Sequence, residues 1–261
     1  MIGATIEARI SSTRLPGKVL MDVVPGWTLL DIVVARAECS DQLSSIVVAT
    51  STNPADDAIV AHCENKGYSY FRGDEHDVLK RVIGAARQFG ITTLVRLTGD
   101  NPLIDGKIID GLIEMREKGN FDYVATTMMG HSENWDAERT VPRGVSMEVL
   151  ATQMLEETDK LDDLLPLERE APTFACYDRP GRYKLGAFVA EGKYACLAHP
   201  ELRLTVDTPE DMSLTKTIFS KLGPKDPTSF STEKAIALVM NNEKLRAINA
   251  DVPHKVMSEI L

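Results

Sequence analysis

The sequence predicts an α/β protein in which a mainly parallel sheet lies between two layers of helices. In the first half, short runs rich in β-branched residues alternate with helical stretches of about a dozen residues, which is typical of βαβ units. The helical stretches carry recognisable start and stop residues. The chain has 261 residues, 43% of them hydrophobic, which suffices for one large domain with a sizeable core.

The first half divides into five strands and four helices. The predicted strands are residues 3–8, 44–50, 68–71, 92–100 and 121–127. The predicted helices are residues 28–39, 54–67, 77–90 and 108–119. Thr28 and Asp31 are spaced as a capping box, and Pro54 and Gly67 mark the start and end of the second helix. Ligands of such sheets bind at the carboxyl ends of the strands, so we expect the functional residues in the loops that leave those ends.

The second half has a different pattern. Residues 128–143 are polar and irregular, and the stretches SMEVLA, TFACY and YKLGAFVA that follow are typical of antiparallel strands. This predicts a β-rich flap at approximately 128–200, inserted into a single domain (1–261), since no linker-like run separates the halves. Helical periodicity resumes at Thr208. Within the tail 223–261, STEKAIALVMNNEKLRAI predicts one amphipathic helix packed on the body.

Charge and composition exclude several classes of function. The chain carries 29 basic and 39 acidic residues, a net charge of -10 that repels nucleic acid. No stretch reaches the roughly 18 apolar residues that span a bilayer, and the start of the chain lacks the features of a signal peptide. The four cysteines form no C-x-x-C pair and are typical of buried thiols. We therefore expect a cytoplasmic protein with neither nucleic-acid nor membrane partners.

The segment EARISSTRLPGKVL (7–20) gathers Arg9, Arg14 and Lys18 beside two serines, a threonine and a Pro-Gly turn, directly after the first strand. Arginine offers forked hydrogen bonds to phosphate and lysine a mobile point charge, so the cluster suits a polyphosphate. A solvated basic surface is the alternative. Val19 follows Lys18, so this is not a P-loop with its magnesium-binding Ser or Thr. The chain also lacks HExxH, GxGxxG and a complete nucleophile elbow.

Two aspartates follow apolar, strand-like runs. Asp100 lies in GDNPLID and Asp207 in LRLTVDTPED. Mg²⁺ in proteins takes one or two carboxylates and completes its shell with phosphate oxygens, so both are candidate magnesium ligands. The alternatives are a solvated turn for Asp100 and a helix start at 207–209 for Asp207. With the basic loop, these carboxylates are the groups needed for attack on a nucleotide phosphate.

Five motifs occur in order: ARISSTRLPGKVL, FRGDEHDVLKR, LTGDNPLID, VPRGVSMEV and LRLTVDTPEDM. They resemble the cytidylyltransferases of the spore-coat polysaccharide biosynthesis protein F type, relatives of the CMP-Kdo and CMP-sialic acid synthetases. The resemblance covers about residues 1–222. It implies a three-layer, Rossmann-like fold of the nucleotide-diphospho-sugar transferase type and a homodimer formed through the flap. It also implies Mg²⁺-dependent transfer from CTP to a small acidic acceptor, with release of pyrophosphate, for surface polysaccharide or glycan biosynthesis.

The resemblance also assigns residues. It implies catalytic roles for Arg9, Lys18 and Asp100, and magnesium binding by Asp100 and Asp207. The nucleotide-binding residues it implies are Ala8, Arg9, Ser12, Arg14, Lys18, Arg72, Gly73 and Asp77. The acceptor-binding residues it implies are Arg143, Gly144, Glu148, Arg169 and Glu170, although Glu148 could equally be a strand residue facing solvent. The family usually has histidine after Arg-Glu, where this chain has Ala171, so the acceptor side is where it departs from the family.

Three other readings stay open at this stage. A guanylyl- or uridylyltransferase acting on a sugar 1-phosphate, or another nucleoside triphosphate as substrate, would use the same parts. A glycosyltransferase would need a D-x-D pair, and NWDAE (134–138) supplies only Asp136. STRLPGK also suits a free triphosphate better than a nucleotide sugar. The altered EREAP stretch is the only support for a non-catalytic nucleotide-binding or scaffold protein.

Overall fold

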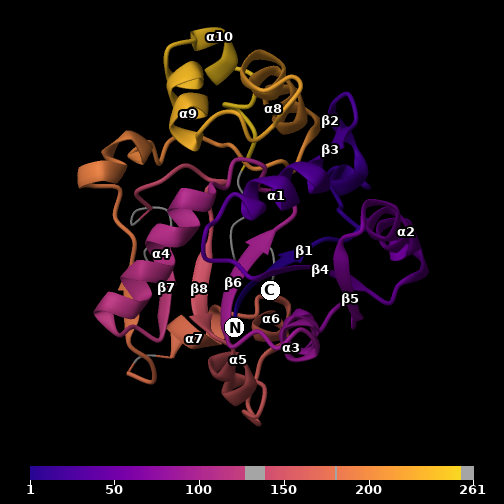
Figure 1. The fold of residues 1–261 in the computed structure, drawn as a ribbon, viewed down its shortest axis with the longest axis vertical. Coiled ribbons are helices and arrows are strands. Elements are labelled where there is room, and N and C mark those ends of the chain that lie inside the picture. Colours follow the sequence, from indigo (N-terminus) through magenta and orange to yellow (C-terminus); the bar gives the residue numbers. More distant parts are fainter. Residues whose placement is uncertain (127–138, 180, 254–261) are drawn as a thin grey trace.

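A computed structural model describes residues 1–126, 139–179 and 181–253. Its described part contains a seven-stranded sheet with the order β5-β4-β1-β6-β8-β7-β9 (Figure 1). Only β8 runs antiparallel to its neighbours. The strands are β1 (Ile2–Glu7), β4 (Ser45–Ser51), β5 (Ser69–Gly73), β6 (Thr93–Thr98), β7 (Tyr123–Ala125), β8 (Glu148–Ala151) and β9 (Leu185–Ala187). A separate hairpin pairs β2 (Asp22–Val24) with β3 (Trp27–Thr28).

Helices cover both faces of the sheet (Figure 1). The α-helices are α1 (Leu29–Glu38), α2 (Asp57–Lys66), α3 (Val78–Gln88), α4 (Gly106–Gly119), α5 (Thr152–Thr158), α6 (Pro166–Glu170), α7 (Phe174–Asp178), α8 (Pro209–Leu222), α9 (Thr232–Met240) and α10 (Glu243–Arg246). The described residues also form three short 3-10 helices, η1 (Lys18–Leu20), η2 (Pro54–Asp56) and η3 (Gly192–Leu197). The predicted mainly parallel sheet between layers of helices is therefore confirmed.

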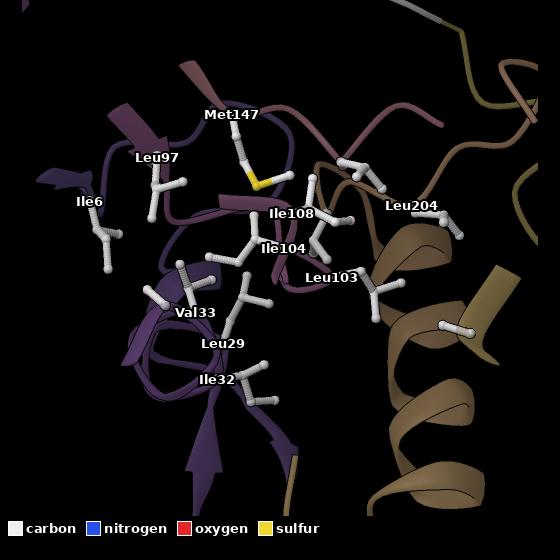
Figure 2. Close-up of a cluster of buried hydrophobic side chains, with 14 of the residues drawn as sticks. Ile6, Leu29, Ile32, Val33, Leu97, Leu103, Ile104, Ile108, Met147 and Leu204 are labelled. Atoms are coloured by element: carbon white, nitrogen blue, oxygen red, sulfur yellow. The ribbon is translucent and has the colours of Figure 1, made fainter. Parts of the chain in front are cut away.

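Two hydrophobic cores form because successive strand residues point to opposite faces. In β4, Val48 joins the core shared with α1, α4 and α8, whereas Val47 and Ala49 join the core shared with α3 and α5. Figure 2 shows part of the first core, where Ile6 and Leu97 of the sheet point towards α1. The strands buried on both sides read as near-continuous apolar runs, as expected for a parallel sheet.

The local signals in the first half of the chain give the predicted elements. Thr28 accepts a hydrogen bond from the Asp31 backbone N–H, and the Asp31 carboxylate accepts one from the Thr28 N–H, so the capping box of α1 is present. Gly67 ends α2 in the left-handed conformation at φ 73°. These caps explain why the boundaries of α1 and α2 fall close to the predicted ones.

The prediction of antiparallel strands in the 128–200 segment holds only in part for its described residues. SMEVLA does contain an antiparallel strand, β8. TFACY forms most of helix α7 rather than a strand. Strands β8 and β9 belong to the central sheet, and β9 pairs with β7 in parallel. Packing overrides β-propensity in TFACY: Ala175 and Cys176 are buried, and Cys176 Sγ lies 3.7 Å from Thr158 Oγ1 of α5. Residues 127–138, which include Asp136, lie outside the described residues.

Two smaller predictions also fail. The run before Asp207 is not a regular strand, since it makes only an isolated parallel bridge between Arg143 and Arg203. The predicted single helix STEKAIALVMNNEKLRAI is instead two helices, α9 and α10, because Asn242 caps α10 by accepting a hydrogen bond from the Leu245 N–H. Among the described residues, none of the helices combines the length and apolar character needed to span a bilayer.

Candidate active site

A cavity of about 390 Å³ lies at the carboxyl ends of the neighbouring strands β1 and β6. This is where the sequence placed the candidate functional loops. The cavity is lined by Glu7, Ala8, Arg9, Ser11, Ser12, Thr13, Arg14, Lys18, Val19, Val78, Arg81, Thr98, Asp100, Glu170 and Asp207. The structure therefore brings the basic loop and the two candidate metal ligands into one site.

The loop after β1 is shaped so that its cations face the cavity. The Ile10 N–H donates to Asp56 Oδ1 at 2.7 Å, which fixes the start of the loop to η2. The Gly17 N–H donates back to the Ile10 carbonyl at 3.0 Å, and Gly17 adopts φ 72°, a conformation that glycine takes without cost. After this turn η1 begins at Lys18, which lines the cavity.

The ammonium of Lys18 joins the two aspartates. Its Nζ donates to Asp100 Oδ2 at 2.9 Å, to Asp207 Oδ1 at 2.9 Å and to the Val206 carbonyl at 2.8 Å. All three of its N–H donors thus have a partner. Burial lowers the pKa of Lys18, but the two carboxylates outweigh that effect, so its pKa lies above the usual value. Lys18 is therefore a fixed positive charge between two negative ones.

The carboxylate of Asp207 contacts three cationic side chains. Besides Lys18, its Oδ2 lies 3.0 Å from Arg14 NH2 and accepts a hydrogen bond from Arg203 NH2 at 2.8 Å. Burial raises the pKa of Asp207, but Lys18, Arg14 and Arg203 outweigh burial and hold the pKa below the usual value. Asp207 is therefore an ionised carboxylate near neutral pH, as a metal ligand must be.

The donor set fits a magnesium ion shared with a ligand. Asp100 and Asp207 converge on one cation, the Lys18 ammonium, so both can offer oxygen to the same region. Within the described residues, no group of three or more His, Cys, Asp or Glu side chains could hold a metal ion alone. Mg²⁺ needs only one or two carboxylates when phosphate oxygens complete its shell. The site thus suits a metal that arrives with a polyphosphate.

Arg9 and Glu170 face each other across the cavity. Arg9 NH2 lies 3.6 Å from Glu170 Oε1, with the two side chains 39% and 49% exposed. At that exposure the ion pair is weak, so Arg9 remains available to a stronger anion. Glu170 is the one predicted acceptor-binding residue that lines the cavity.

Three of the predicted nucleotide-binding residues, Arg72, Gly73 and Asp77, are not part of the cavity lining. Arg72 donates to the Ser51 and Asn53 carbonyls and pairs with Asp57. Asp77 caps α3 by accepting a hydrogen bond from the Lys80 N–H at 3.0 Å.

Gly73 lies close to Arg81, and a Cβ at Gly73 would lie 2.9 Å from the Arg81 side chain. In this structure these residues shape the 72–77 loop.

The other predicted acceptor residues are held by protein partners. Arg169 NH1 pairs with Asp77 at 2.9 Å and with Asp159 at 3.0 Å. Glu148 accepts hydrogen bonds from Arg96 and from Thr173, and its side chain is 14% exposed. The solvent-facing alternative for Glu148 is therefore wrong.

Arg143 and Gly144 pack against the segment that leads to Asp207. The Arg143 N–H donates to the Leu202 carbonyl, and the Leu204 N–H donates to the Arg143 carbonyl. Gly144 has φ 96°, and a Cβ there would lie 2.3 Å from the Thr205 backbone nitrogen. The two residues support the segment that carries Asp207 through backbone contact.

Sequence reasoning missed two charged residues of the cavity wall. Arg81 is 3% exposed, and its NH1 donates to the Asp74 and Glu75 carbonyls, which fixes the 72–77 loop. Glu7 forms a two-bond pair with Arg96. The sequence did contain a signal for each residue. Arg81 is a charged residue on the apolar face of α3, and Glu7 is a charged residue at the end of an apolar strand.

Comparison with known protein families identifies the class of enzyme to which the chain belongs. The family model described as "Cytidylyltransferase" matches residues 4–248. The chain belongs to the cytidylyltransferase family. It is therefore a nucleotidyltransferase, which supports that reading over the glycosyltransferase and scaffold alternatives.

Known members of the family and solved structures agree with this assignment. The chain is 31% identical over 230 residues to the spore coat polysaccharide biosynthesis protein SpsF of Bacillus subtilis (strain 168), covering 87% of this chain and 89% of that protein. It is 29% identical to a cytidylyltransferase structure from Leptospira borgpetersenii, with a TM-score of 0.82 over 97% of this chain and 99% of that one. A CMP:2-keto-3-deoxy-manno-octonic acid synthetase complexed with CTP shares the fold, with 18% identity and a TM-score of 0.59 over 84% of this chain and 98% of that one.

Proposed function

We propose that this cytidylyltransferase-family protein transfers CMP from CTP to a small acidic sugar or another small anionic acceptor and releases pyrophosphate, with Mg²⁺ as the metal. The observation that carries the proposal is the cavity at the ends of β1 and β6. There, Arg9, Arg14 and Lys18 face two converging carboxylates, Asp100 and Asp207. The choice of CTP, and a role in surface polysaccharide or glycan biosynthesis, are supported by the family and by the names of its relatives.

The cations of the loop would bind the triphosphate. Arg9 and Arg14 present guanidinium groups for forked hydrogen bonds, and the Ser12 side chain lines the same wall. In this structure Arg9 pairs with Glu170, Arg14 pairs with Asp207, and Lys18 pairs with both aspartates. Triphosphate would take over the pairing with these cations. Asp100 and Asp207 would then be free to hold Mg²⁺, which when bound supplies charge neutralisation at the α-phosphoryl group.

The transfer itself needs positioning more than covalent chemistry. An acceptor oxygen attacks the α-phosphorus in line, the bond to the β-phosphate oxygen breaks, and pyrophosphate leaves with its charge compensated by Arg9 and Lys18. The described residues that line the cavity include no histidine. The low pKa of Asp207 makes it a poor proton acceptor. An acceptor that enters as an anion would need no general base.

The Asp100→Ala variant tests the site directly. We expect its turnover to fall by about three orders of magnitude or more, because the variant loses one of the two carboxylates proposed to hold Mg²⁺ at the α-phosphoryl group. The protein should remain folded. The measurement is pyrophosphate release at saturating CTP, Mg²⁺ and acceptor, with circular dichroism as the check on folding. Asp22→Asn, a change at an exposed residue of the β2–β3 hairpin, is the matched control. Near-normal turnover of Asp100→Ala would remove Asp100 from the reaction.

A further inference from the structure

Arg203, Asp211 and Asn249 form a buried, hydrogen-bonded cluster beside Asp207, hereafter the Arg203 cluster. None of the three lines the cavity. The side chains of Arg203 and Asp211 are 7% and 0% exposed, and Asn249 is 6% exposed. Because the cluster is charged and buried, its geometry is set by its hydrogen bonds and not by solvent.

The guanidinium of Arg203 links this cluster to the active site. Its Nε and NH2 donate to the two carboxylate oxygens of Asp211, each at 2.9 Å. The same NH2 donates to Asp207 Oδ2 at 2.8 Å. A forked pair with Asp211 fixes the plane of the guanidinium, and a fixed plane sets the direction of the remaining bond to Asp207.

Asp211 also holds the main chain at Asp207. Its Oδ2 accepts hydrogen bonds from the backbone N–H groups of Asp207 at 3.0 Å and Thr208 at 3.1 Å. The backbone of Asp207 is therefore tied to Asp211 directly, and its carboxylate is tied to Asp211 through Arg203. Asp211 therefore helps to orient Asp207, whose carboxylate is also contacted by Lys18 and Arg14.

Asn249 fixes both members of that pair. Its Nδ2 donates to Asp211 Oδ1 at 2.8 Å and to the Arg203 carbonyl at 3.0 Å. It lies one residue beyond the family match, which ends at residue 248, in a tail whose only predicted role was packing. The same tail reaches the cavity loop, since Arg14 NH1 donates to the Pro253 carbonyl at 3.4 Å.

We propose that Asn249 is a positioning residue of the active site, which orients the carboxylate of Asp207 through Asp211 and Arg203. The inference rests on the proposed function, because the role of Asp207 comes from there. Loss of Asn249 would leave Asp211 and the Arg203 main chain each without one hydrogen bond. Asp207 would then be held less firmly on its Arg203 side, while its contacts with Lys18 and Arg14 of the loop after β1 would remain.

Kinetics of Asn249→Ala and Asn249→Asp provide the first test. We expect Asn249→Ala to raise the Mg²⁺ concentration for half-maximal pyrophosphate release by about tenfold and to lower kcat by a similar factor, with KM for CTP within about twofold of the wild type. Asn249→Asp keeps the shape but replaces the donor with a negative oxygen next to Asp211, so its loss should be larger. If Asn249 had only a structural role, Asn249→Ala would lower the melting temperature and leave the Mg²⁺ dependence unchanged.

Asn242→Ala is the matched control. It removes the cap of α10 in the same tail, without touching the Arg203 cluster. We expect it to lower the melting temperature and leave the Mg²⁺ dependence unchanged. An equal shift of the Mg²⁺ dependence in Asn242→Ala would overturn the proposal, because general loosening of the tail would then explain the effect.

Crystal structures of the nucleotide-free wild type and of Asn249→Ala give a readout that does not depend on activity. We expect the hydrogen bond from Arg203 NH2 to Asp207 Oδ2 in the wild type and its loss or displacement in the variant. An unchanged Asp207 carboxylate in the variant would overturn the positioning role. A wild type that releases no pyrophosphate with any nucleotide would instead refute the proposed function, and the two crystal structures would still decide the role of Asn249.

Discussion

Lys18 links the two candidate metal ligands of the site, Asp100 and Asp207. Its side chain is 9% exposed and lies between two carboxylates. Removal of this charge would leave Asp100 and Asp207 close together without the ammonium between them, although Arg14 and Arg203 would still contact Asp207. Lys18 therefore has two roles in this account: it balances Asp100 and Asp207 before the substrate binds, and it contacts phosphate afterwards.

The Lys18→Met variant separates these roles. Without the ammonium, we expect the free energy of unfolding to fall by about 1–3 kcal/mol at neutral pH, because Asp100 and Asp207 repel each other. Added Mg²⁺ without nucleotide should recover part of this loss in the variant and have little effect on the wild type. Urea unfolding with and without Mg²⁺ measures both. A variant as stable as the wild type would show that Lys18 does not compensate the two aspartates.

The ionised carboxylates also predict how stability depends on pH. Burial raises the pKa of Asp211, but hydrogen bonds from Arg203 and Asn249 outweigh it, and the pKa of Asp207 is likewise below its usual value. A carboxyl whose pKa is lower in the folded than in the unfolded state stabilises the protein above the unfolded value of 3.8 and loses that contribution as the pH falls through the folded value. For the raised pKa of Lys18, the contribution is present below 10.5 and is lost only at higher pH.

We therefore expect the stabilisation from these groups to stay constant between about pH 5 and pH 9 and to fall steeply below about pH 4. Unfolding by urea at a series of pH values from 2 to 7 measures this. In Asp211→Asn the fall below pH 4 should be shallower, since one titrating group with a lowered pKa is gone. An equally steep fall in that variant would contradict the assignment of a lowered pKa to Asp211.

At the scale of elements, the segment before Asp207 is held by the turn at Gly144 and not by a strand. Gly144 combines φ 96° with close contact to the backbone of Leu204 and Thr205. A side chain there would meet both a conformational penalty and a clash, so the VPRG motif serves backbone packing beside the segment that carries Asp207.

Gly144→Ala should consequently cost at least about 1–3 kcal/mol of stability from the backbone conformation alone. The clash should displace 203–207 and lower turnover by a larger factor than it changes KM for CTP. Thermal unfolding and steady-state kinetics measure the two effects. Gly181→Ala, at another positive φ but with open space around its Cβ, is the matched control. Equal losses in both variants would contradict the role of close packing.

The elements that the sequence predicted well are those with local signals. The ends of α1 and α2 depend on Thr28, Asp31 and Gly67, which act on neighbouring residues. Helix α7 was missed because the burial of Cys176 against α5 is a tertiary contact. A predicted strand before Asp207 failed for a similar reason: an apolar run indicates burial, and burial alone does not specify strand pairing.

At the scale of the whole molecule, the same distinction holds for the site. Lys18, Asp100 and Asp207 could be predicted together, because the first two follow neighbouring strands of a parallel sheet and their chemistry is complementary. Asn249 could not be predicted, since it contacts Arg203 from 46 positions away through packing of the tail. The acceptor-side residues Arg143, Arg169 and Glu148 make protein contacts in this structure, so their binding roles remain predictions, as does the homodimer.

The charge of the whole molecule also bears on its substrates. The net charge is -10, so an anionic nucleotide and an anionic acceptor approach against the overall field. The cavity is less acidic than the molecule as a whole, because its lining carries four basic side chains (Arg9, Arg14, Lys18 and Arg81) and four acidic ones (Glu7, Asp100, Glu170 and Asp207). Such a site suits small anions, which can enter the cavity and pair with these cations, better than an extended polyanion such as nucleic acid.

The most direct test of the central claim is pyrophosphate release from CTP, GTP, UTP and ATP with Mg²⁺, measured against a panel of acidic sugars, sugar phosphates and phosphonates. The account predicts release with CTP and one anionic acceptor, and none when Mg²⁺ is removed by EDTA. Release with GTP or UTP and a sugar 1-phosphate would contradict the choice of base and acceptor. If no combination of nucleotide and acceptor released pyrophosphate, and the protein bound a nucleotide sugar tightly, nucleotidyl transfer itself would be contradicted.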